Sequence, residues 1–277
     1  MDSFSLKGQT AVITGAARGL GLAFAQALGE AGANIAVLDV IDPEPALKQI
    51  QTDHGVKVEF YKTDVTSREQ VAGAVERIMR EFGRVDININ AAGIVKDEPF
   101  LTTSDENLSK TFAVNFTGSF LVAQACANAM IQTHRQEIDS AKATPNSPTP
   151  IHGSIVFIAS IATHISTTAQ RISCYTASKA AVRGLVKPLA MELAKHGIRV
   201  NSLSPGYTMT DMMRGLQREQ PKLVAQFERE TMFGRIGTPE ELKGAVLFLC
   251  SRASGWVTGQ DVLVDGGASS WKHAATL

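Results

Sequence analysis

The sequence predicts an α/β fold in which a doubly wound parallel sheet carries helices on both faces. Short apolar runs alternate with longer segments of helical period nearly to the end of the chain. These runs are continuous rather than alternating with polar residues, which is typical of strands buried on both faces. Because connections between parallel strands are right-handed, the alternation predicts a doubly wound arrangement.

A single domain over residues 1–277 is expected, since this length suits one large α/β domain and no linker rich in Pro, Gly or Ser divides the chain. The 27 basic and 27 acidic residues balance, which argues against nucleic-acid and membrane-surface partners. The apolar runs are too short to span a bilayer, and the first residues lack a signal peptide's pattern. Cys126, Cys174 and Cys250 have no metal-ligand spacing, which indicates reduced thiols in a cytoplasmic protein that binds no metal.

The individual elements follow from the same patterns. The apolar run at 10–13 predicts the first strand, and a helix over 20–31 follows a glycine-rich turn. Strands are expected at 34–38 and 56–61, and residues 67–82 form an amphipathic helix because their apolar side chains share one face. The remaining strands are expected at 85–89, 154–158, 199–203 and 262–264.

Two segments depart from this alternation. Residues 134–152 are polar and contain three prolines, which predicts a surface-loop insertion. The loop enters a strand from its amino end, whereas ligands of such sheets bind beyond the carboxyl ends, so no catalytic role is assigned to it. Residues 207–235 follow a strand's carboxyl end and are rich in methionine, which suits a substrate lid and equally suits apolar packing.

A glycine-rich turn, with Gly15, Gly19 and Gly21, lies between the first strand and its helix. Glycines in this context let the backbone approach a pyrophosphate at the helix N-terminus. Asp39 ends the second strand, where its carboxylate can bind both ribose hydroxyls and would repel a 2′-phosphate by roughly 4 kcal/mol at about 4 Å. NAD is therefore predicted. Arg18 suits a phosphate, which leaves NADP as the alternative.

Two further strand ends are candidates for the adenosine half of the cofactor. Asp64 could meet the adenine amine and Val65 could lie under the base, although Asp64 could instead cap the following helix. The small residues between Asn90 and Gly93 leave room for the adenosine.

Tyr175 and Lys179 are spaced to share one helix face, and Ser160 precedes them. A lysine held beside a phenol favours the phenolate, because the positive charge stabilises the ionised form. We therefore expect Lys179 to lower the pKa of Tyr175 and make it a general acid/base.

Together these motifs resemble the single-domain branch of the short-chain dehydrogenase/reductase (SDR) superfamily. Beyond the glycine turn and Tyr-x-x-x-Lys, the likeness includes Val114-Asn115, the stretch 201–206 and the closing Val264-Asp265-Gly266-Gly267. The resemblance implies a seven-stranded Rossmann-type sheet, a nicotinamide cofactor and a homotetramer or dimer. It also implies a catalytic tetrad of Asn115, Ser160, Tyr175 and Lys179.

The resemblance gives each member of the tetrad a role. Tyr175 would take the alcohol proton, and Ser160 would bind the substrate oxygen. Lys179 would bind the nicotinamide ribose, and Asn115 would hold a water that leads to solvent. The implied cofactor-binding residues are Gly15, Arg18, Gly19, Leu20, Gly21, Asp39, Asp64, Val65, Asn90, Gly93, Tyr175, Lys179, Pro205, Gly206, Thr208 and Thr210.

Ser160 stands 15 residues before Tyr175, a longer segment than is common, and this is similar to the sugar-alcohol and ketose dehydrogenases. The candidate substrate residues are His164, Gln170, Tyr207, Met212 and Met213. His164 could bind a substrate hydroxyl or make a purely structural hydrogen bond. The long segment favours a polyol, whereas the methionine-rich lid favours an apolar cyclic alcohol, and the sequence leaves this choice open.

The resulting hypothesis is an NAD-dependent oxidoreductase that interconverts a secondary alcohol and a ketone, with a small-molecule substrate as its partner. An NADP-linked ketone reductase is the alternative, favoured if Arg18 dominates the ribose pocket. A catalytically silent dinucleotide-binding regulator is the third reading, which the intact tetrad disfavours.

Overall fold

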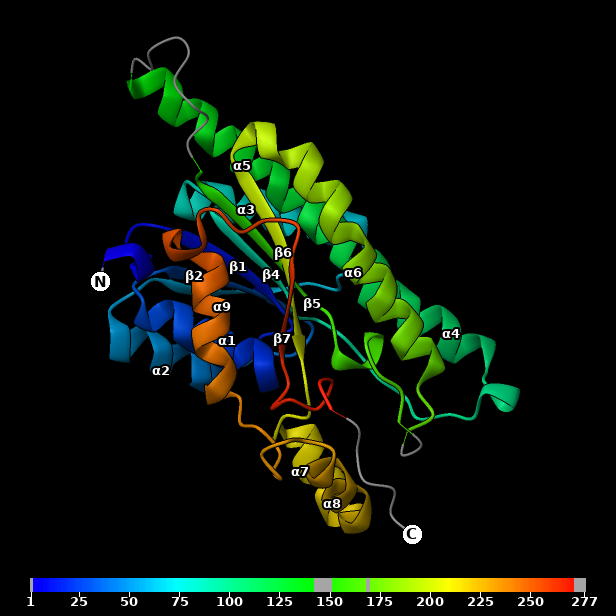
Figure 1. Cartoon of the computed structure of the whole chain (residues 1–277). Coiled ribbons are helices and arrows are strands. Elements are labelled where there is room, and N and C mark those ends of the chain that lie inside the picture. Colours follow the sequence, from blue (N-terminus) through cyan, green and yellow to red (C-terminus); the bar gives the residue numbers. More distant parts are fainter. Residues whose placement is uncertain (1, 142–150, 168–169, 272–277) are drawn as a thin grey trace.

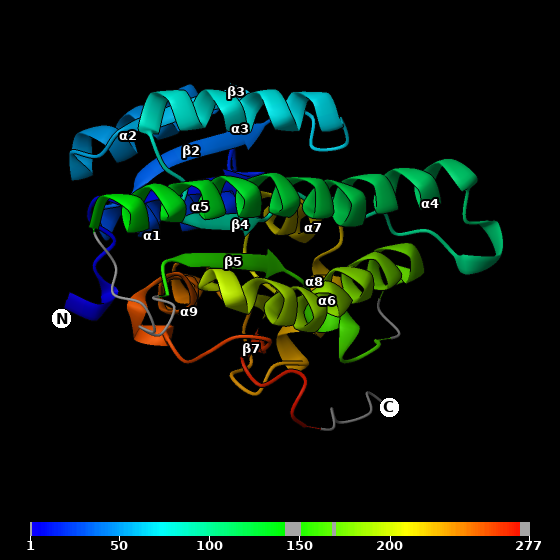
Figure 2. The ribbon, with the colours of Figure 1, turned by 90° about the horizontal axis from the view of Figure 1, so that it is seen from above.

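A parallel sheet organises the molecule (Figure 1, Figure 2). The computed structural model describes residues 2–141, 151–167 and 170–271, and these residues form seven strands in the order β3-β2-β1-β4-β5-β6-β7. Every neighbouring pair is parallel, which confirms the predicted fold class. The strands are β1 Thr10–Thr14, β2 Asn34–Asp39, β3 Val58–Lys62, β4 Ile87–Asn90, β5 Gly153–Ile158, β6 Ile198–Pro205 and β7 Asp261–Val264.

Helices cover the two faces of the sheet, as Figure 2 shows from above. One face packs against α1 Gly19–Glu30, α2 Glu44–His54 and α9 Glu240–Cys250. The other packs against α3 Arg68–Phe82, α5 Ser119–Ala141 and α6 Ser173–Leu193. Helix α4 Asp105–Phe112 runs through the π-helical segment η3 Ala113–Gly118 into α5. Within the described residues, no helix has both the length and the apolar character that a bilayer crossing requires.

The continuous apolar runs are explained by a core on each side of the sheet. In β1, Ala11 and Ile13 join the core beneath α1 and α9, whereas Val12 joins the core beneath α3 and α5. All five residues of β1 are buried. Alternating side chains therefore enter opposite cores, which explains why the apolar run at 11–13 is continuous.

The predicted loop at 134–152 is partly wrong, because α5 continues as a helix to Ala141. Residues 134–141 contain neither Pro nor Gly, and Pro145 is the first residue there that cannot continue a helix. The His134 ring is buried and stacks on His152, with ring centroids 3.7 Å apart. The rest of the predicted loop, residues 142–150, lies outside the described residues.

The segment proposed as a lid, residues 207–235, folds as a pair of helices. α7 Asp211–Glu219 and α8 Pro221–Arg229 lie beyond the carboxyl ends of the strands, in yellow and gold in Figure 1. A small separate core of Val224, Phe227 and Ile236 holds them, and Met213 packs against it. Met212 is exposed by contrast. Packing therefore accounts for Met213, and the role of this segment as a substrate lid stays a prediction.

The tight turn before α1 makes Gly21 sensitive to any side chain. A Cβ on Gly21 would meet the carbonyl oxygen of Gly15 and lie 2.9 Å from the Ala16 Cα, both of them backbone atoms. Since the backbone cannot yield easily, we expect Gly21→Ala to lower the free energy of unfolding by about 1–3 kcal/mol. Urea unfolding measures this change.

Gly73 in α3 is the matched control, because a Cβ there meets nothing within 4 Å. Gly73→Ala should raise the free energy of unfolding by about 0.5–1 kcal/mol, as a helical Gly-to-Ala change does. Equal effects of the two substitutions would contradict the packing argument.

Candidate active site

A cavity of about 1110 Å³ opens at the carboxyl ends of the strands. It lies where β1 pairs with both β2 and β4, the point at which the strand order reverses and ligands of such sheets bind. Three residues predicted for the site, Asn90, Asn115 and His164, do not line the cavity. The predicted residues that line it are Gly15, Arg18, Gly19, Leu20, Gly21, Asp39, Asp64, Val65, Gly93, Ser160, Gln170, Tyr175, Lys179, Pro205, Gly206, Tyr207, Thr208, Thr210, Met212 and Met213.

The glycine turn lies directly against the end of β4. Gly15 has a φ of +67°, and a Cβ there would lie 2.6 Å from the Ala92 Cα. The Thr14 hydroxyl accepts hydrogen bonds from the amides of Ala91 and Ala92, each 3.1 Å long. The N-cap residue Arg18 makes no side-chain hydrogen bond to the first turn of α1, so amide groups of that turn can bind a ligand in the cavity. This cradle of bare backbone fits the pyrophosphate of a dinucleotide.

Asp39 is held in a fixed orientation at the end of β2. Its Oδ2 accepts from the Ala17 amide at 2.9 Å, and its Oδ1 accepts from the Ile41 amide at 3.1 Å. Arg18 lines the same part of the cavity. A ribose in this position would meet a carboxylate whose direction the backbone has already set.

The next two strand ends behave differently. The Asp64 carboxylate accepts from the amide and the hydroxyl of Thr66, and Ser67, not Asp64, caps α3. Asn90 is buried, and its amide donates to Asn88 at 2.7 Å. Asn90 therefore supports the sheet beneath the cavity rather than lining it.

Asn115 also lies behind the cavity wall. It is fully buried in η3, where its side chain bonds both backbone groups of Ile94 and donates to the Ser178 hydroxyl at 2.9 Å. Asn115 and Lys179 come close to each other beside Gly93. A Cβ on Gly93 would lie 3.2 Å from the Lys179 Nζ and 3.4 Å from the Asn115 Oδ1. Asn115 therefore shapes the wall around Lys179.

Lys179 and Tyr175 extend from α6 into the cavity. The Lys179 Nζ donates to the Ile158 carbonyl at 2.7 Å and lies 5.9 Å from the centre of the Tyr175 ring. Burial lowers the pKa of Lys179 to about 8. Burial also raises the pKa of Tyr175, although its hydrogen bond with Ser160 opposes this. Lys179 is not among the causes of this shift, so the expected lowering of the Tyr175 pKa by Lys179 is not seen in this structure.

Ser160 lines the same cavity as Tyr175 and Lys179, but it comes from the segment after β5 rather than from α6. It is buried at the end of β5, where it caps the short helix η4 Ile161–Thr163 and accepts from the Ala162 amide at 3.1 Å. The hydrogen bond between Ser160 and Tyr175 brings the two hydroxyls together. Such a pair can bind one oxygen of a substrate and exchange a proton with it.

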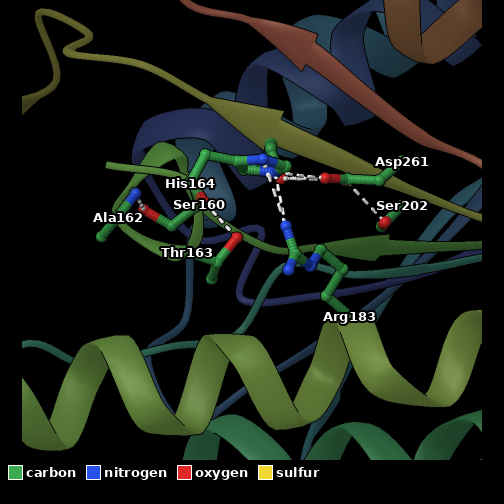
Figure 3. A network of polar contacts seen from close by, with 8 residues as sticks. Ser160, Ala162, Thr163, His164, Arg183, Ser202 and Asp261 are labelled. Atoms are coloured by element: carbon green, nitrogen blue, oxygen red, sulfur yellow. Dashed lines mark hydrogen bonds and ion pairs between the residues drawn. The ribbon is translucent and has the colours of Figure 1, made fainter. Parts of the chain in front are cut away.

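His164 does not face the cavity, which corrects its prediction as a substrate residue. Its ring is engaged by Asp261 and Arg183 behind the Ser160 turn (Figure 3). The structural hydrogen bond considered as the alternative is therefore present. The other candidates, Gln170, Tyr207, Met212 and Met213, line the cavity.

Sequence reasoning missed Glu230, a buried carboxylate under the substrate end. It accepts from the Tyr207 hydroxyl at 2.6 Å, from Thr167 at 2.8 Å and from Gln226 at 3.0 Å. Its backbone carbonyl accepts from the Trp271 indole at 3.1 Å. Only the Gln226 contact is local in sequence, so no spacing pattern could have revealed this cluster.

The comparisons with known proteins agree with this geometry. A family model described as "Enoyl-(Acyl carrier protein) reductase" matches residues 15–269. The 5-keto-D-gluconate 5-reductase of Escherichia coli (strain K12) is 34% identical over 268 residues, which cover 96% of this chain and 97% of that protein.

Two solved structures are similar along almost the whole chain. A short-chain type dehydrogenase/reductase from Mycobacterium marinum has a TM-score of 0.85 and 38% identity, covering 97% of this chain and 98% of the other. A gluconate 5-dehydrogenase from Burkholderia cenocepacia J2315, in complex with NADP and tartrate, has a TM-score of 0.85 and 34% identity, with 98% and 99% covered.

The buried ammonium makes stability depend on pH. Since the folded pKa of Lys179 is about 8 and an ordinary lysine titrates at 10.5, the unfolded chain binds more protons here between these values. The free energy of unfolding of the wild type should therefore rise with pH relative to Lys179→Met. Urea unfolding of both proteins from about pH 8 to pH 10 measures the difference. Parallel pH profiles would contradict the buried, depressed lysine.

Proposed function

Since the chain belongs to the short-chain dehydrogenase/reductase superfamily, we propose that it is an NAD-dependent dehydrogenase that interconverts a secondary alcohol and a ketone on a sugar acid or polyol. The observation that carries the proposal is one cavity that joins the bare glycine turn to Ser160, Tyr175 and Lys179. An oxidoreductase of CH–OH groups needs these two halves side by side, one for a dinucleotide and one for proton transfer.

The residues present fit a nicotinamide dinucleotide. The turn around Gly15 would hold the pyrophosphate, Asp39 the adenosine ribose, and Lys179 the nicotinamide ribose. When bound, this cofactor supplies the acceptor or donor of hydride. The protein's own part is to bind the substrate oxygen and to move a proton.

Proton transfer falls to Tyr175 in this proposal. Because burial raises its pKa, the hydroxyl is held neutral, the form that donates a proton to a ketone oxygen. Ser160 donates a second hydrogen bond to the same oxygen, where negative charge grows during reduction. In the oxidative direction Tyr175 has to be ionised, and its hydrogen bond with Ser160, which lowers its pKa, favours that form. Asn115 orders the wall around Lys179 and would hold the water that leads its proton to solvent.

The choice between NAD and NADP depends on Asp39. Its carboxylate is fixed by two backbone amides and would face a 2′-phosphate at close range, which favours NAD. A repulsion of about 4 kcal/mol approaches a thousandfold difference in affinity. NADP is the second candidate, because the Burkholderia relative was crystallised with NADP and Arg18 lines this part of the cavity.

The relatives favour a polyhydroxylated substrate over an apolar cyclic alcohol. The Escherichia coli and Burkholderia proteins are named for gluconate and its keto form. Gln170 in the cavity wall can donate to and accept from substrate hydroxyls. A homotetramer, with a dimer as the alternative, stays a prediction that sedimentation of the purified protein measures. The cytoplasmic location also stays a prediction.

Asp39→Ala tests the cofactor assignment. Removing the carboxylate should weaken NAD and relieve the repulsion of NADP, which narrows the ratio of the two dissociation constants on the order of a hundredfold or more. Fluorescence titration with NADH and NADPH gives both constants. Asp42→Ala, an exposed carboxylate nearby, is the control and should leave the ratio unchanged. A ratio that Asp39→Ala also leaves unchanged would refute this account of the ribose pocket.

Tyr175→Phe tests the reaction itself. Without the hydroxyl, turnover should fall on the order of a hundredfold to ten-thousandfold, since a positioned acid/base contributes that much. NADH formation with gluconate and linear polyols, and NADH consumption with their keto forms, measure turnover. NADH binding should persist, because the phenyl ring still fills the wall. A wild-type protein that binds NADH but turns over none of these compounds would support the silent binder instead.

A further inference from the structure

We propose that His164 is a positioning residue, which together with Asp261 and Arg183 fixes the Ser160 turn against the helix that bears Tyr175. The inference rests on the proposed function, because it concerns the geometry of the same two hydroxyls. It also replaces the earlier view of His164 as a substrate ligand.

The Ser160 turn is attached to its neighbours at its start, where the Ala159 amide donates to the Leu203 carbonyl of β6 at 2.8 Å and Ser160 is hydrogen-bonded to Tyr175. The rest of the turn is shaped by its own backbone. It runs from Ser160 to His164, with Thr163 donating to the Ser160 carbonyl at 2.9 Å and the His164 amide donating to Ile161 at 2.8 Å. These bonds shape the turn, but they do not attach it to the elements around it. The chain then needs 15 residues to pass from Ser160 to Tyr175, so the connection alone cannot fix their separation.

The His164 side chain supplies an attachment on two sides (Figure 3). Its Nε2 lies 2.6 Å from the Asp261 Oδ2, and Arg183 Nη1 lies 3.2 Å from its Nδ1 and 2.9 Å from its Nε2. The ring therefore lies between an acceptor, the Asp261 carboxylate, and a donor, the Arg183 guanidinium. The carboxylate and the guanidinium bind the ring from β7 and α6 respectively.

Asp261 is itself oriented from β6. Its Oδ1 accepts from the hydroxyls of Ser202 at 2.7 Å and Ser204 at 2.9 Å. The carboxylate side chain is 15% exposed and the His164 side chain 24%, so water competes for these bonds only in part. The anchor on β7 is therefore rigid, because a neighbouring strand holds it.

Arg183 connects the anchor to the catalytic helix. It follows Lys179 by four residues and Tyr175 by eight in α6, a spacing that puts all three on one side of the helix. A contact between His164 and Arg183 therefore links the turn that carries Ser160 to the helix that carries Tyr175. Loss of the anchor should let the two hydroxyls drift apart without disturbing the cofactor half.

The first experiment compares His164→Ala with His164→Gln. We expect His164→Ala to lower kcat about tenfold, since small misplacements of reacting groups carry costs of this size. The dissociation constant for NADH should stay within about twofold, because the glycine turn and Asp39 lie elsewhere. His164→Gln should recover most of kcat, because its amide can still donate to Asp261. His54→Ala, an exposed histidine of α2, is the matched control.

An unchanged kcat in His164→Ala would overturn the proposal. So would a loss confined to NADH binding, or a His164→Gln variant as slow as His164→Ala.

The second experiment needs no turnover and so separates this proposal from the proposed function. Hydrogen exchange of a peptide over residues 158–166 should be faster in His164→Ala, with peptides from β2 and α9 unchanged. If the wild type turns over no alcohol or ketone, the proposed function fails, but faster exchange would still support the anchor. Unchanged exchange in the 158–166 peptide would overturn it.

Discussion

The site depends on how closely the ends of β1 and β4 approach each other. The Thr14 hydroxyl binds the amides of Ala91 and Ala92, and Gly15 packs on the same backbone without room for a Cβ. These contacts between the ends of β1 and β4 fix the orientation of the glycine turn. The next residue after Ala92, Gly93, lies against Lys179 and Asn115. The cofactor half and the catalytic half are therefore built on a single stretch of backbone, and a shift of one would move the other.

Burial works against charge throughout the catalytic wall. It lowers the pKa of Lys179 to about 8 and raises that of Tyr175, so both groups are pushed toward their neutral forms. The hydrogen bond from Lys179 to the Ile158 carbonyl offsets part of the cost of burying an ammonium group. The pKa values of such an acid/base pair depend on burial as well as on the distance between the two groups. The pKa of Tyr175 is thus set by its burial and by its hydrogen bond with Ser160, neither of which the spacing of Tyr175 and Lys179 reveals.

Sequence patterns predicted the sheet well because its strands are buried on both faces, so periodicity and burial agree. Most of the residues that they proposed for the site line the cavity, since glycine turns and strand ends carry local signals. They failed where distant contacts decide. The orientation of His164 depended on Asp261, 97 residues away. The π-helical segment around Asn115 and the Glu230 cluster likewise left no mark in local spacing. The extent of α5 was a different failure, because the absence of a helix breaker before Pro145 is a local signal that the three prolines of the segment outweighed.

Glu230 gives the substrate end a cooperative character. One buried carboxylate joins α8 to Tyr207 in the cavity wall and to Thr167 in the loop after β5, while its backbone carbonyl holds Trp271. Moving Tyr207 or Thr167 away removes a hydrogen-bond donor from the Glu230 carboxylate and exposes it to water. The three are therefore expected to come apart together rather than fray one by one. Opening the substrate end in this way would require a single carboxylate and its donors to be rehydrated in one event.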